Sequence, residues 1–154
     1  MRDVLLRRAA RDESDAVAAL FRLSKETALS FLPELHTPEE DRAFFRDRVF
    51  ADCEVWVASR LGSLAGFCAF RAGWVDHLYV APEQQRRGIG SALLDTARGG
   101  QQELRLWTFQ RNASARRFYE AQGFVVERLT GGENEEREPD ILYRWRRDGA
   151  RTGD

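Results

Sequence analysis

The stretch that decides the fold is an apolar strand followed by a glycine turn and a helix: Val75-Asp-His-Leu-Tyr-Val80, then Ala-Pro-Glu, then Gln85-Arg-Arg-Gly-Ile-Gly90-Ser91. A helix N-terminus leaves backbone N–H groups unpaired and carries a partial positive charge, so it attracts anions. Glycine tolerates unusual dihedral angles and lets a ligand approach the backbone closely. We therefore interpret the turn as a diphosphate site, although glycine at such a turn is also common for packing reasons alone. The amides that would bind belong to Arg86, Arg87, Gly88, Ile89, Gly90 and Ser91.

A second motif follows about twenty residues later, after a strand predicted at 103–108. It reads Gln110-Arg-Asn112-Ala-Ser-Ala115-Arg-Arg-Phe118-Tyr119-Glu-Ala-Gln-Gly123-Phe124. The two motifs together, Q-R-R-G-I-G and N-x-x-A-x-x-F-Y-x-x-x-G-F, resemble the GCN5-related N-acetyltransferase (GNAT) superfamily. The resemblance is clearest from about Val55 to Phe124. It implies that the first motif cradles the pyrophosphate of acetyl-CoA and that the second places a tyrosine beside the thioester sulfur.

The same resemblance implies roles for individual residues. It assigns the cofactor contacts on the strand to Leu78, Tyr79 and Val80, with the backbone of Leu78 and Val80 pairing with the pantetheine arm and the Val80 N–H as oxyanion donor. It makes Tyr119 the general acid that protonates the leaving thiolate, although a half-buried helix tyrosine often only satisfies its own hydroxyl. Asn112 is expected both to cap its helix and to contact the cofactor. Arg86 and Arg87 add charge to the phosphate site or are simply solvated.

The base that deprotonates the amine is chosen among the titratable groups on the strand, Asp76 and His77. Strand alternation predicts that the two face opposite sides and that Asp76 shares its side with Leu78 and Val80. We favour Asp76, because a histidine among apolar neighbours is commonly structural. A chain of water to bulk solvent is the third alternative. Some relatives carry an acid near the end of the fifth strand, where this chain has Trp107.

The acceptor side of this fold is built by two loops, here Phe31 to His36 and Glu133 to Asp140. The second loop is rich in acids that suit a cationic amine, although an acidic loop is also typical of a solvated surface. We favour a small amine as acceptor, with a protein or peptide amine as the alternative. The acids are Glu133, Glu135, Glu136, Glu138 and Asp140, and the strand tryptophans Trp56, Trp74 and Trp107 are candidates for lining the acceptor pocket.

Composition limits the remaining classes. The chain has 154 residues, 43% hydrophobic and 32% charged, which fits one globular domain. It has no apolar run near the roughly 20 residues that span a membrane, and no signal peptide is recognised, so we expect a cytoplasmic protein. Cys53 and Cys68 make no disulfide framework, and we expect no metal site. The net charge of −1 argues against a nucleic-acid partner.

The order of predicted elements is β-α-α-β-β-β-α-β-α-β-β, which predicts an α/β fold: one GNAT-like domain with a mixed sheet of about seven strands and four flanking helices. Residues 1–146 form this domain and residues 147–154 are expected to be a frayed tail. Helix caps are predicted at Asp12, at Thr37 and at Asn112. The rival functions are a non-catalytic acyl-CoA sensor and an arginine-based nucleic-acid binder, and an edge strand leaves a homodimer open.

Overall fold

Seven strands form one mixed sheet in the order β1-β2-β3-β4-β5-β7-β6 in the computed structural model, which describes residues 3–147. All neighbouring strands are antiparallel except β4 and β5, which are parallel. The predicted seven-stranded α/β fold is confirmed. The strands are β1 (Val4–Arg8), β2 (Glu54–Arg60), β3 (Ser63–Arg71), β4 (Trp74–Val80), β5 (Glu103–Phe109), β6 (Val125–Leu129) and β7 (Asp140–Arg146).

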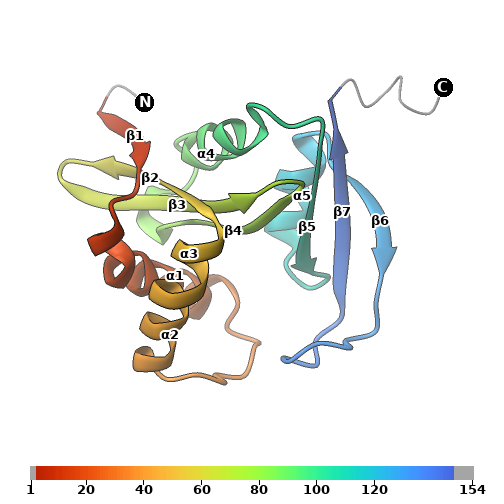
Figure 1. Ribbon diagram of the computed structural model, residues 1–154. Coiled ribbons are helices and arrows are strands. Elements are labelled where there is room, and N and C mark those ends of the chain that lie inside the picture. The colour runs from red at the N-terminus through yellow and green to blue at the C-terminus, as the bar shows by residue number, and fades with distance from the viewer. Residues whose placement is uncertain (1–2, 148–154) are drawn as a thin grey trace.

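Helices cover both faces of the sheet (Figure 1). Alternate residues of β2 contribute to two cores: Val55 and Val57 pack with α1 and with the π-helical turn that follows α2, whereas Ala58 packs with α4, as strand alternation requires. The helical segment that begins with α2 is continuous through a π-helical turn into α3, so the predicted count of four is confirmed. The helices are α1 (Ser14–Ala28), α2 (Pro38–Phe44), the π-helical turn Phe45–Val49, α3 (Phe50–Asp52), α4 (Ile89–Arg98) and α5 (Ala113–Ala121).

Two of the three predicted helix caps are confirmed. Thr37 Oγ1 accepts the Glu40 N–H at 3.1 Å and Glu40 returns a bond to the Thr37 N–H at 2.8 Å, a complete capping box. Asn112 Oδ1 accepts the Ala115 N–H at 3.1 Å. The cap predicted at Asp12 is wrong, because the N-cap position of α1 is Glu13 and no side chain makes a cap bond to this helix.

Glu13 is the last residue of a short turn before α1, and its side chain bonds back to the residue before that turn. A 3-10 turn, Arg11–Glu13, precedes α1, and the Glu13 carboxylate accepts the Ala10 N–H at 2.8 Å. Arg7 of β1 holds the same carboxylate through two bonds of 2.8 Å and is the main reason that the pKa of Glu13 falls to about 2. The position of the Glu13 carboxylate therefore depends on a residue of β1 as well as on its neighbours in the sequence.

Helical spacing predicts that Phe44, Phe45 and Val49 of the α2–α3 segment all point inward, and the structure confirms this for two of them. Phe45 and Val49, four residues apart, are buried, whereas Phe44 is 44% exposed. A helix turns about 100° per residue, so Phe44 cannot share the inner face with its neighbour Phe45. The prediction that Phe44 points inward is wrong.

The end of the domain extends one residue beyond the predicted boundary. Arg147, assigned to the tail, donates its backbone N–H to Gln102 O at 2.9 Å and its guanidinium to Arg98 O at 2.6 Å. The rest of the predicted tail, residues 148–154, lies outside the described residues. Within 3–147, no helix is both long enough and apolar enough to cross a membrane.

Candidate functional site

The sheet is nearly divided between β4 and β5. Among residues 3–147, the only paired position of these two strands is Trp74 with Arg105, next to a bond from the Arg105 N–H to Gly73 O at 2.9 Å. Beyond this point the strands diverge, and β5, β7 and β6 stand at an angle to β1–β4 (Figure 1). The rest of β4 thus presents a backbone edge in the middle of the sheet.

The residues that present this edge follow from the pairing of β4 with β3. Ala81 donates its N–H to Ala65 O at 2.8 Å, and Tyr79 is paired opposite Phe67 in the same register. Alternate residues of an antiparallel strand bond to opposite neighbours, so the backbone groups of Leu78 and Val80 point toward β5. Three strand residues are predicted to contact a cofactor, and the backbone of one of them, Tyr79, is paired with β3 instead.

The glycine turn ends directly beneath this edge and opens into α4. Gly88 is the N-cap residue with φ of 81° in the left-handed region, and no side chain caps the helix. The residue two positions earlier, Arg86, also has a positive φ of 66°. The first-turn N–H groups of α4 are consequently uncapped by protein side chains, which is the arrangement that binds anions.

The other predicted residues of the turn divide into packing and polar groups. Ile89 is 1% exposed and packs in the α4 core, so only its amide can serve a ligand. A Cβ on Gly90 would lie 3.4 Å from the Phe118 ring, so tight packing against this ring also favours glycine at this position. Ser91 Oγ accepts a bond from Gln122 of α5 at 2.8 Å. Arg86 and Arg87 are exposed.

Tyr119 lies behind the divergence of β4 and β5, on α5. It is 8% exposed, with its ring 5.2 Å from Phe118, 5.6 Å from Phe124 and 6.2 Å from Tyr143 between centroids. Burial raises the pKa of Tyr119 well above its ordinary value. The hydroxyl is therefore a protonated phenol over the whole physiological range, as a proton donor must be.

Asp76 does not share a side with Leu78 and Val80, and this prediction is wrong. The pairing of β3 with β4 shifts between Ala69 and Phe70, which pair with His77 and Val75 respectively. Asp76 is the extra residue of a β-bulge, and a bulge breaks strand alternation. Both Asp76 and His77 consequently line one hollow beside α3.

The surroundings of the two candidate bases differ. Arg71 donates to Asp76 from Nε at 2.6 Å and from Nη2 at 3.1 Å, and the Cys53 thiol donates to it at 3.3 Å. His77 lies among phenylalanine rings, including Phe21 and Phe45, each 5.5 Å away between centroids. Burial lowers the pKa of His77 to about 4, so its imidazole is neutral at pH 7.

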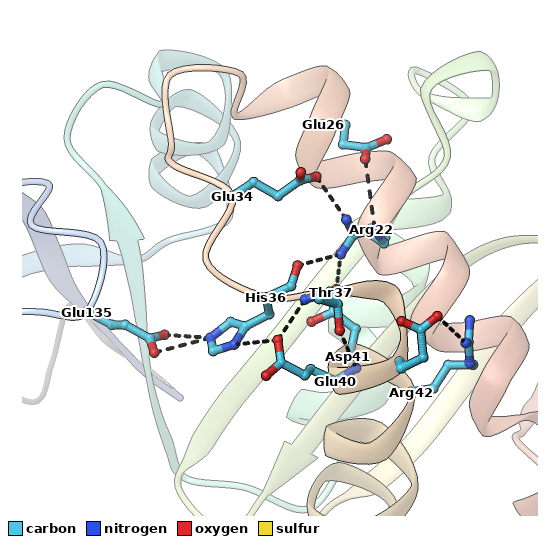
Figure 2. A network of polar contacts seen from close by, with 10 residues as sticks. Arg22, Glu26, Glu34, His36, Thr37, Glu40, Asp41, Arg42 and Glu135 are labelled. Atoms are coloured by element: carbon cyan, nitrogen blue, oxygen red, sulfur yellow. Dashed lines mark hydrogen bonds and ion pairs between the residues drawn. The ribbon is translucent and has the colours of Figure 1, made fainter.

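The two loops expected on the acceptor side meet across the open end of the sheet. His36 Nε2 lies 3.1 Å from both oxygens of Glu135 in the β6–β7 loop, as Figure 2 shows. A second bridge joins the same loops through Phe31, whose ring lies under the Arg111 guanidinium at 4.2 Å, and Arg111 pairs with Glu138 at 3.4 Å. These contacts connect segments about a hundred residues apart in the sequence.

Arg22 of α1 holds the first of these loops in place and was not found from the sequence. It binds Asp41 and Glu34, each at 2.8 Å, and donates to His36 O at 3.0 Å (Figure 2). The only nearby sequence signal is Glu26 at i+4, and that pair is 3.9 Å apart. Its main partners lie 12 to 19 residues away, where spacing rules give no indication.

Comparison with known proteins agrees with this geometry. The family model described as "Acetyltransferase (GNAT) domain" matches residues 51–126, which include β4, the glycine turn and Tyr119. This chain contains a GNAT acetyltransferase domain. A solved structure of YjaB from Escherichia coli superposes with a TM-score of 0.75 at 22% identity, covering 92% of this chain and 97% of that one. A PaiA N-acetyltransferase of Thermoplasma acidophilum, solved with coenzyme A, gives a TM-score of 0.68 at 20% identity, covering 94% and 99%.

Curated relatives match the central part of this GNAT domain. The peptidyl-lysine N-acetyltransferase YiaC of Escherichia coli is 38% identical over 82 residues, which is 53% of this chain and 56% of that protein. The probable N-acetyltransferase Rv2775 of Mycobacterium tuberculosis is 33% identical over 85 residues, 49% of each. The aligned region spans about half the length of the curated relatives.

Other candidate sites in this GNAT domain are sparse. Among residues 3–147, no group of three or more histidine, cysteine, aspartate or glutamate side chains is placed to hold a metal ion. Cys68 is buried, and burial also raises the pKa of the Cys53 thiol to about 12. Neither thiol is activated as a nucleophile. Within residues 3–147, the remaining candidates for chemistry are backbone amides, Tyr119 and the side chains of the two bridged loops.

Proposed function

We propose that this GNAT domain transfers the acetyl group of acetyl-CoA to a primary amine, by direct attack of the amine on the thioester in a ternary complex. The observation that carries the proposal is the divergence of β4 from β5 above the uncapped N-terminus of α4. A linear cofactor with a phosphate end and an amide-containing arm matches both features. The match to the GNAT domain supports the same chemistry.

The cofactor contacts follow from the backbone groups of the β4 edge and the α4 N-terminus, among which the Val80 carbonyl also accepts a bond from Gln85 Nε2 at 3.2 Å. The diphosphate binds the first-turn amides from Gly88 to Ser91, and the exposed Arg86 and Arg87 supply charge. The amides of the pantetheine arm pair with Leu78 and Val80 as an added strand. Asn112, whose side chain already caps α5, is a further contact that the family resemblance supports.

The reaction needs a stabilised oxyanion and a proton for the leaving thiolate. The Val80 N–H points toward β5 and serves as the oxyanion donor. Tyr119 donates its proton to the sulfur as the C–S bond breaks, because burial keeps its hydroxyl protonated. The catalytic part of the site is therefore one backbone amide and one phenol.

The amine proton leaves through water rather than through Asp76. The Asp76 carboxylate is bound by Arg71, and four residues of strand separate it from Val80, about 13 Å. A carboxylate so paired and so distant is poorly placed to take a proton from an amine at the thioester. The low pKa of His77 makes its imidazole a weak base.

The acceptor we favour is a small cationic amine. Beside the first of the two bridged loops lies a hollow of about 200 Å³, lined by α1, by residues of the 29–36 segment and by Asp41. Burial is the main reason that the pKa of Tyr79 is raised, and the charge of the half-buried Glu136 in the second loop adds to the effect. A peptidyl lysine is the second candidate, supported by the similarity to YiaC. Either acceptor would enter with its aminoalkyl end first.

The test is thiol release from acetyl-CoA with polyamines, aminoglycosides, amino acids and lysine peptides, alongside calorimetry of cofactor binding. Turnover confined to small amines supports the favoured acceptor, and turnover confined to lysine peptides supports the second. Tight cofactor binding without turnover on any amine would contradict the proposed enzymatic activity and favour a non-catalytic acyl-CoA sensor. Steeply salt-dependent binding to DNA or RNA without cofactor binding would favour the nucleic-acid rival.

A further inference from the structure

The chain contains one lysine. Its 24 basic residues are 23 arginines and Lys25, and arginine side chains stay protonated under all ordinary conditions. Lys25 therefore carries the only side-chain amine of the protein that can act as a nucleophile toward a thioester. In an enzyme for acetylating amines, the position of that one amine is informative.

Lys25 lies on the acceptor side of β4. Its Nζ is 4.9 Å from the centre of the Phe21 ring, one helical turn earlier on α1. The Phe21 ring in turn packs edge-on against Tyr79 and His77 of β4, at 5.3 and 5.5 Å between centroids. The Lys25 charge reaches His77 strongly enough to contribute to its low pKa. The amine thus contacts the Phe21 ring, and that ring contacts the strand along whose edge the thioester arm is proposed to bind.

The Lys25 side chain is also free to move. It lines the same 200 Å³ hollow that we assign to the acceptor, and within residues 3–147 no carboxylate lies within 4 Å of its Nζ. The neighbouring Glu26 is turned to Arg22 at 3.9 Å. A cation over an aromatic ring is held weakly at a partly exposed site, so rotation about the four-carbon stem can move Nζ off Phe21.

We propose that this GNAT domain acetylates its own Lys25, an inference that rests on the proposed function. The neutral Lys25 amine attacks the thioester carbonyl, the new C–N bond forms and the C–S bond breaks. The amine gives one proton to water, Tyr119 protonates the departing thiolate, and the phenol is restored from solvent. The products are CoA and Nε-acetyllysine, and no redox partner is needed.

Self-acetylation changes the acceptor hollow. It removes a positive charge beside the position of a cationic acceptor, so repulsion falls and the acceptor KM falls with it. Burial is the main reason that the pKa of His77 is low, and acetylation removes only the smaller contribution of the Lys25 charge. The modification would therefore act as a one-time activation of the enzyme for cationic amines.

The experiment is incubation of the full chain with acetyl-CoA and no added amine, followed by intact mass and peptide mapping. We expect one acetyl group at Lys25, with a first-order rate constant that does not change when protein concentration is raised tenfold, because reaction within one molecule benefits from a high effective concentration. Lys25→Arg should gain no acetyl group at this position. Tyr119→Phe should slow the modification at least tenfold.

The controls separate this proposal from the proposed function. Gly88→Asp, given the same acetyl-CoA, reports chemical acetylation without the cofactor site, and a rate equal to wild type would overturn self-acetylation. An unmodified Lys25 in an enzyme that turns over added amines would also overturn it, while leaving the proposed function intact. Absence of both reactions despite cofactor binding would overturn the proposed function itself. As an independent readout, Lys25→Gln should lower the KM of a cationic acceptor relative to Lys25→Arg.

Discussion

The two sides of β4 are held together by different physics. On the cofactor side, backbone amides of one turn and one strand edge form the site, and apolar packing between α4 and α5 positions them. On the acceptor side, ion pairs and aromatic contacts such as His36 with Glu135 join two separate loops. The first kind of site depends on local conformation and tolerates few changes at glycine. The second depends on side chains that titrate and can be exchanged, which is where substrate preference can vary without loss of the cofactor.

Gly88→Asp should give the largest effect and strike the cofactor side alone. The residue has φ of 81°, and a carboxylate there would meet the diphosphate at the α4 N-terminus. We expect acetyl-CoA affinity to fall about 100-fold or more, about 2.7 kcal/mol, measured by calorimetry. Gly62→Asp is the matched control, since Gly62 has φ of 82° in a hairpin turn with open space around it. Equal loss in both variants would mean that backbone strain, not charge, causes the effect.

Tyr119→Phe should separate chemistry from binding. Loss of the general acid should lower kcat about 100-fold while acetyl-CoA affinity changes less than about threefold, measured by steady-state kinetics and calorimetry. Tyr143→Phe is the control, because Tyr143 is buried in the same aromatic cluster but donates its hydroxyl to Glu120 at 2.7 Å. Unchanged kcat in Tyr119→Phe would remove the general acid from the proposed reaction.

The pKa values of the two histidines should be shifted in opposite directions from the ordinary value. Both histidines lie on the proposed acceptor side, so we expect that side to be the pH-sensitive one. The bond to Glu135 raises the pKa of His36 above its ordinary value, whereas burial lowers that of His77 to about 4. Stabilisation by the His36 bridge is therefore complete below about pH 6.5 and lost as pH rises through the folded-state pKa. Stabilisation from neutral His77 is complete above about pH 6.5 and falls as pH drops toward 4.

NMR titration of the two imidazoles checks this prediction. Glu135→Gln should return the pKa of His36 toward its ordinary value and leave His77 unchanged. The acceptor KM should rise between pH 6 and 8 as the bridge weakens, while the KM of acetyl-CoA stays flat. A cofactor KM that follows the His36 titration would contradict the division between the two sides.

Asp76→Asn should give the smallest effect. The Asp76–Arg71 pair is partly exposed, so its loss should lower the melting temperature by about 2 °C or less and change kcat/KM less than about threefold. Arg71→Gln should reproduce the same small shift if the pair is only structural. A loss of about 100-fold in kcat/KM confined to Asp76→Asn would restore the aspartate as the base.

The local structure of the proposed cofactor side could be predicted from the sequence because its signals are local. The glycine turn, the Asn112 cap and the strand–turn–helix order each lie within a few residues, and local backbone preferences act at that range. Family resemblance then supplied roles for Leu78, Val80 and Tyr119, which still await the experiments above. Burial of Val17, Leu20 and Phe21 on α1 also followed from helical spacing and is confirmed.

The acceptor side could not be predicted to the same extent, because its contacts depend on tertiary packing. The sequence Val75–Val80 gives no signal for the β-bulge, because the extra residue is defined only by the pairing of β4 with β3. The bulge places Asp76 on the same side of the strand as His77. The Arg22 network and the His36–Glu135 bridge join residues distant in sequence. Acidic residues in 133–140 could be noted from composition, but which of them pairs with which partner could not.

The backbone edge of β4, which is nearly unpaired on the side of β5, has a consequence for amide hydrogen exchange. Central strands of a sheet are normally the slowest to exchange, because both neighbours protect them. Here β4 is the fourth of seven strands, yet the N–H groups of Leu78 and Val80 point toward a strand that has diverged. These two amides should exchange much faster than the Tyr79 amide between them, and a ligand that adds a strand should slow them selectively. The fastest amide exchange within the paired strands is therefore expected in the middle of this sheet rather than at its edges.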